Sequence, residues 1–130
     1  MALLALLLLA LVPIAAWRWF RTRAPRHLWF ATGVAFGLVV SPLSLGLYST
    51  FFLSPLGLPT GLLGLMSSLF HGEPGYQVSI WLGLVPSHEV VTGIGHLYVE
   101  LVTGLIWAPL YGVVGALIDW VRIARSRQSA

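Results

Sequence analysis

The last long apolar run of the chain, residues 97–118, constrains the fold most strongly; it reads LYVELVTGLIWAPLYGVVGALI. An α-helix rises about 1.5 Å per residue, so a run of this length is able to cross a hydrocarbon core of about 30 Å. Small residues recur at every fourth position of the run, at Gly104, Ala108, Gly112 and Ala116. Because small residues let helix backbones approach closely in lipid, this row predicts a membrane-spanning helix with a packing face.

The composition of the whole chain agrees with residence in a membrane. Hydrophobic residues make up 58% and charged residues 8%, whereas charged residues make up about 25% of a typical soluble domain. The arginines fall in two clusters beside apolar runs, at residues 18–26 and 122–127. This placement is typical of membrane topology signals, not of nucleic-acid binding. The chain has no cysteine, which excludes disulfides and thiolate metal sites. We therefore expect one all-α membrane domain, residues 1–130, whose first partner is the lipid bilayer.

Two other runs, residues 2–20 and 28–53, are predicted to cross the membrane as well. Arginines follow the first run, whereas a cleaved signal peptide carries its positive charge before the apolar segment, so we expect a retained helix. The second run contains Pro42, which is expected to kink the helix. It also contains Gly33 and Gly37, a GxxxG pair that we add to the predicted packing face.

Residues 54–96 contain no arginine or lysine and are rich in proline and glycine. With three crossings, at residues 2–20, 28–53 and 97–121, both arginine clusters stay on the cytoplasmic side and residues 54–96 lie outside. Residues 60–70 provide only about half of the ~20 apolar residues that a crossing needs, so we expect a short interfacial or re-entrant helix there. The amino terminus is then external and the basic tail, residues 122–130, is cytoplasmic, as in a bacterial inner-membrane protein.

A candidate ligand or proton site lies among the ionisable residues of this external side. If a helix begins at residue 88, Glu89, His96 and Glu100 share one face, and the last two lie one turn apart. The structural alternative is a hydrogen-bonded His–Glu pair near the interface. Glu100 lies within an apolar run and must be protonated, paired or directed at a polar cavity. The set does not form a complete metal site; its members are His71, Glu73, His88, Glu89, His96 and Glu100.

Asp119 and the tryptophans have structural interpretations. Asp119 lies one turn from Arg122 and near the first arginine cluster, which favours an ion pair. Most of the tryptophans lie near predicted helix ends, as in an aromatic belt. Trp107 lies within a predicted crossing, and we expect it to be buried against protein.

The sequence lacks the common hydrolase, nucleotide-binding and zinc-protease motifs, so we expect no enzyme. The outer segment is too apolar to be freely solvated, which favours a non-catalytic accessory or structural subunit of a larger membrane protein complex. Two alternatives stay open. One is a subunit that binds haem, a chlorophyll-type pigment or a metal through external histidines, and the other is a small oligomeric transporter or pore. The sequence leaves the identity of any cofactor open.

Overall fold

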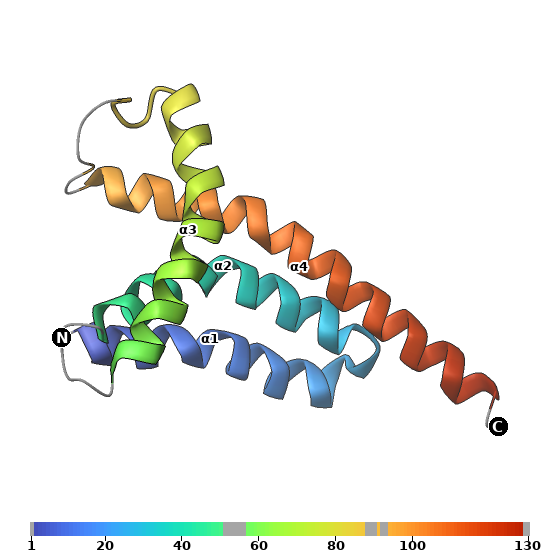
Figure 1. Cartoon of the computed structure of the whole chain (residues 1–130). Helices are drawn as coiled ribbons and strands as arrows, with labels where there is room; N and C mark the ends of the chain where they lie inside the picture. The colour runs from blue at the N-terminus through green and yellow to red at the C-terminus, as the bar shows by residue number, and fades with distance from the viewer. Residues whose placement is uncertain (1, 51–56, 88–90, 92–93, 129–130) are drawn as a thin grey trace.

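The structure, a computed structural model, describes residues 2–50, 57–87, 91 and 94–128, with side chains described from Ala10 onward. The chain forms helix α1 (Ala2–Arg23), a short 3-10 turn η1 (Pro25–His27), and helices α2 (Leu28–Ser49), α3 (Leu58–Trp81) and α4 (Ile94–Gln128) (Figure 1). The described part of the chain contains no strand. The prediction of an all-α fold is confirmed over these residues.

Helices α2 and α4 form the centre of the molecule and share its most extensive helix–helix contact. They run antiparallel, because Leu38 lies against Gly104 while Trp29, near the start of α2, lies against Gly115. Helix α1 packs on α2 after the tight turn at η1, as Figure 1 shows. The small core of the described chain lies mainly along the buried side of α2, at Leu28, Ala31, Ala35, Val39 and Val40.

Two of the described helical segments, Pro25–Ser49 and Ile94–Gln128, are long and apolar enough to cross a bilayer. This result rests on length and composition alone and gives weak support for a membrane location. The third predicted span, residues 2–20, lies in α1, where the described side chains begin at Ala10. Three crossings therefore stay a prediction.

The expectation of a short, separate helix at residues 60–70 is wrong, because α3 is one helix of 24 residues. Pro59 lies in its first turn, where proline does not remove a needed hydrogen bond, and the helix continues through Pro74. Its glycines do not break it: Gly61, Gly64 and Gly75 are buried where α3 crosses steeply over α2 and α4 (Figure 1). Long-range packing thus outweighs the local helix-breaking signals.

The ends of the other helices also differ from expectation. Val91 is not helical and α4 starts at Ile94, so a continuous helix from residue 88 is wrong. The basic tail is not a separate segment, because α4 continues to Gln128 and carries Arg125 and Arg127 in its last turn, where positive charge is favoured. Helix α2 ends at Ser49, before the predicted limit at residue 53; residues 51–53 lie outside the described residues.

Candidate functional site

A cleft of about 240 Å³ lies between α2, α3 and α4. Polar side chains from all three helices line it, and its other walls include Leu69 and Val99. Glu73, His96 and Glu100 of the predicted site all line this cleft, although α3 and α4 are separated in the chain. The polar lining residues are Ser41, Ser68, Glu73, Tyr76, His96 and Glu100.

Glu100 has the most demanding environment in the cleft. One carboxylate oxygen, Oε2, is buried and has no hydrogen-bond partner among the described residues. The hydroxyl of Ser41, a residue only 2% exposed, hydrogen-bonds the carboxyl, and His96 interacts with it electrostatically. Leaving a carboxylate oxygen without a donor costs free energy, particularly beside apolar helices. A proton, a cation or a donor from another molecule would satisfy this oxygen.

The remaining members of the predicted site are distributed differently. Glu73 lines the cleft but is exposed, and it accepts a hydrogen bond of 2.7 Å from Gln77 Nε2. His96 is exposed in the first turn of α4, one turn before Glu100. His88 and Glu89 lie outside the described residues. Within the described part of the chain, no group of three His, Asp or Glu side chains is arranged to hold a metal ion.

His71 is buried away from this cleft and connects α3 to α4. Its Nε2 lies 2.7 Å from the Tyr111 hydroxyl, and its Nδ1 lies 2.8 Å from the Ser67 carbonyl oxygen. A neutral imidazole satisfies both contacts if Nδ1–H donates to the carbonyl and Nε2 accepts from the tyrosine. Because both ring nitrogens are engaged, His71 has no nitrogen left for a metal or haem iron in this arrangement.

The surroundings of His71 extend this connection to α2. The Ser67 hydroxyl lies 2.6 Å from that of Ser44, which also donates to the Val40 carbonyl at 2.6 Å. On the other side, the Trp107 indole N–H donates to the His71 carbonyl at 2.9 Å. Trp107 is therefore part of a polar and aromatic cluster that joins three helices, and sequence reasoning did not foresee this cluster.

Five of the six residues of the predicted packing face lie in the α2–α4 contact. A Cβ added at Gly37 would lie 2.6 Å from the Ala108 backbone, and one at Gly33 would overlap the Tyr111 carbonyl. Gly104, Ala108 and Gly112 are buried on α4. The face is thus used within this chain, so these residues are not free to bind another subunit.

The sixth residue, Ala116, is exposed, and the neighbouring Gly115 is buried against the Trp29 carbonyl instead. Helix geometry explains the difference. At about 100° per residue, Gly115 lies about 20° from Gly104 around the helix axis, whereas Ala116 lies about 120° away. Each four-residue step rotates the position by about 40° around the helix, so the row gradually leaves the contact with α2. The three-residue step from Gly112 to Gly115 returns to the contact.

Asp119, at the opposite end of the α2–α4 pair, does more than form an ion pair. Its Oδ2 accepts hydrogen bonds of 2.9 Å from the backbone N–H groups of Trp29 and Phe30, and its Oδ1 lies 3.4 Å from Arg122. Helix α2 has no capping side chain of its own and no acidic residue in its first turn. Asp119 therefore caps α2 from α4, a role that sequence analysis missed although the missing local cap was a signal for it.

Comparison of the chain with models of known protein families, with curated protein sequences and with solved structures gave no significant match.

Proposed function

We propose that the chain is a non-catalytic accessory or structural subunit of a larger membrane protein complex. The observation that carries the proposal is an exposed apolar ridge on α3 that borders the cleft around Glu100. The ridge consists of Leu62, Leu63, Met66, Leu69 and Phe70. Their spacing of three and four positions places them on one side of the helix.

The position of the ridge favours a protein neighbour. Lipid tails would cover the apolar side chains, but they offer no donor to the unpartnered oxygen of Glu100. Leu69 belongs to the ridge and also lines the cleft. A partner helix lying on the ridge would therefore reach the cleft, where one donor side chain would satisfy the carboxylate.

The arrangement of charge supports an orientation for this subunit. Arg21, from the first cluster, and Arg122, from the second, line the same pocket, so both clusters are at one end of the helical bundle. We propose that this end is cytoplasmic and that the amino terminus of α1 is external, in a bacterial inner membrane.

Site-specific photo-crosslinking tests the proposal. A photoreactive amino acid at Met66, which is 70% exposed, should give a discrete adduct with another protein in the native membrane. Val113 of α4, which is 60% exposed and outside the ridge, is the matched control and should give only lipid adducts. Lipid adducts alone at Met66, together with a lone monomer in mild detergent, would overturn the proposal.

Cation or proton transport by an oligomer is the second candidate, favoured by the same unpartnered oxygen. In that case the cleft of Ser41, His96 and Glu100 would take up the ion. Replacing Glu100 with Gln should then abolish a flux measured in liposomes, while Glu73→Gln at the exposed edge should leave most of it. Absence of flux from the unaltered chain would eliminate this function without affecting the subunit proposal.

A further inference from the structure

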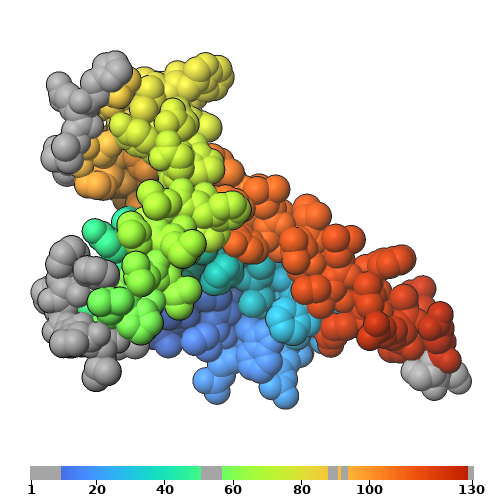
Figure 2. Space-filling view, viewed as in Figure 1, coloured from blue at the N-terminus to red at the C-terminus, as the bar shows by residue number. Residues whose placement is uncertain are grey.

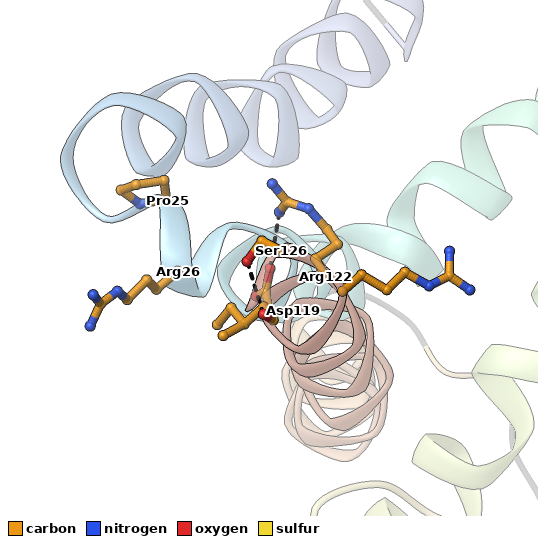
Figure 3. A pocket seen from close by; sticks show the side chains of 7 residues that line it. Pro25, Arg26, Asp119, Arg122 and Ser126 are labelled. Carbon is orange, nitrogen blue, oxygen red and sulfur yellow. Dashed lines mark hydrogen bonds and ion pairs between the residues drawn. The ribbon is translucent and has the colours of Figure 1, made fainter. Parts of the chain in front are cut away.

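The end of the bundle that carries the arginines contains three adjoining open pockets. Three pockets of about 450, 490 and 330 Å³ lie there, between the α1–α2 turn and the last turns of α4. The first pocket shares Pro25 and Arg122 with the second, and Arg26 and Asp119 with the third. Figure 3 shows Arg26 from the turn and Arg122 from α4 on either side of Asp119. We call this combined hollow the arginine groove.

The arginine groove has an excess of positive charge. Arg21, Arg26, Arg122 and Arg125 line it. The lining carboxylate, Asp119, is 5% exposed and is engaged by the α2 backbone and by Arg122. Arg26 makes no ion pair within the described part of the chain. Arg26 therefore carries a charge that no carboxylate among the described residues neutralises, and the groove attracts an anion.

The walls of the groove identify the kind of anion. Apolar side chains from both candidate spans lie beside the arginines, among them Leu28, Phe30, Ile118 and Ile123. Three tryptophans, Trp17, Trp29 and Trp120, complete the rim, and the Arg21 guanidinium lies 5.0 Å from the ring centre of Trp17. Arginine with tryptophan at the end of a membrane helix is typical of the headgroup level of a bilayer.

We propose that the arginine groove binds the phosphate headgroup of an anionic phospholipid. Arg26 and Arg122 point in different directions in Figure 3, and in this proposal both side chains turn toward the phosphate oxygens, since guanidinium groups bind phosphate in a bidentate manner. The acyl chains remain in the bilayer along the apolar wall, which the open shape of the groove permits. The bound lipid holds the α1–α2 turn against α4. The inference requires the proposed membrane location, but it is independent of the subunit role.

Lipid retention by the purified full-length chain tests this inference. In mixed nanodiscs of phosphatidylcholine and phosphatidylglycerol, native mass spectrometry should find phosphatidylglycerol enriched about tenfold or more on the chain, given the attraction of each arginine for anionic lipid. The double variant Arg26→Gln/Arg122→Gln should lose this enrichment. The control Arg18→Gln/Arg127→Gln removes the same charge outside the groove and should keep it.

Two further measurements keep the result decisive. Because Arg122 also pairs with Asp119, the single variant Arg26→Gln is compared with Arg18→Gln, and only the former should lower the enrichment. Inorganic phosphate in excess should not displace the lipid. Equal enrichment on groove and control variants would show attraction by general surface charge and overturn the proposal. Displacement by inorganic phosphate would assign the groove to a soluble anion and would also overturn it. A crosslinked partner at Met66 would be unaffected by either outcome.

Discussion

At the level of single residues, Asp119 connects the last turns of α4 to the first turn of α2. The first backbone N–H groups of a helix have no partner within the helix, and a carboxylate there also interacts favourably with the helix dipole. Asp119 fulfils both roles for Trp29 and Phe30 from a position about 90 residues away in the chain. The contact explains why an acidic residue is buried at this position.

Replacing Asp119 with Ala should lower the free energy of unfolding by about 2–4 kcal/mol, because two hydrogen bonds to a charged acceptor are lost. Arg122→Gln is the control and should cost less than about 1 kcal/mol, because its side chain is 50% exposed. Unfolding of the detergent-solubilised chain, followed by circular dichroism, measures both values. Equal losses would mean that the ion pair, not the cap, is the important contact.

Tyr111 and His71 form the second residue-level contact that can be tested. Tyr111→Phe removes the hydroxyl and leaves His71 Nε2 without its partner, so we expect a loss of about 1–2 kcal/mol in the free energy of unfolding. A double-mutant cycle with His71→Phe should give a coupling energy of about 1 kcal/mol between the two side chains. Additive effects of the two substitutions would contradict the hydrogen bond.

At the level of helices, α2 and α4 are the elements that the sequence predicts well. Their apolar runs are long, so composition and length are sufficient to recognise them. Helix α3 is harder to predict, since Pro59, Gly72 and Pro74 are local signals for interruption. The contacts that override these signals, such as Gly64 against Leu47 and Tyr48, depend on the final placement of the helices.

The candidate site could likewise be predicted from the sequence only in part, because it depends on how the helices are placed. His96 and Glu100 are one turn apart on one helix, so their proximity follows from the sequence alone. Glu73 joins them only because α3 crosses both α2 and α4. Ser41 and Tyr76 were missed: a serine or tyrosine in an apolar chain is not distinctive until the opposite wall of the cleft is known.

Adjacent residues of α4 provide a direct test of the helix contact. Gly115→Val should push α4 away from the Trp29 carbonyl and lower the free energy of unfolding by about 1–3 kcal/mol or more. Ala116→Val, one position later and exposed, should change it by less than about 0.5 kcal/mol. If the two variants unfolded in the reverse order, the four-residue row predicted from the sequence would be the true contact.

At the level of the whole molecule, large apolar side chains cover much of the surface, while the arginines gather at one end. Figure 2 shows one side of the molecule, on which α3 lies across α2 and reaches α4. The internal small-residue contact joins α2 to α4, and the side chains of the apolar ridge of α3 are largely exposed. In the proposed function, α2 and α4 form the frame of a membrane subunit and α3 is its docking element.

The central expectation for this chain is that both arginine clusters lie on one side of the membrane. The chain contains no cysteine, so single-cysteine variants label cleanly. With a membrane-impermeant maleimide on intact cells, Ser87→Cys should react, whereas Thr22→Cys and Gln128→Cys should react only after the membrane is permeabilised. Labelling of Thr22→Cys and Gln128→Cys from opposite sides would contradict this expectation.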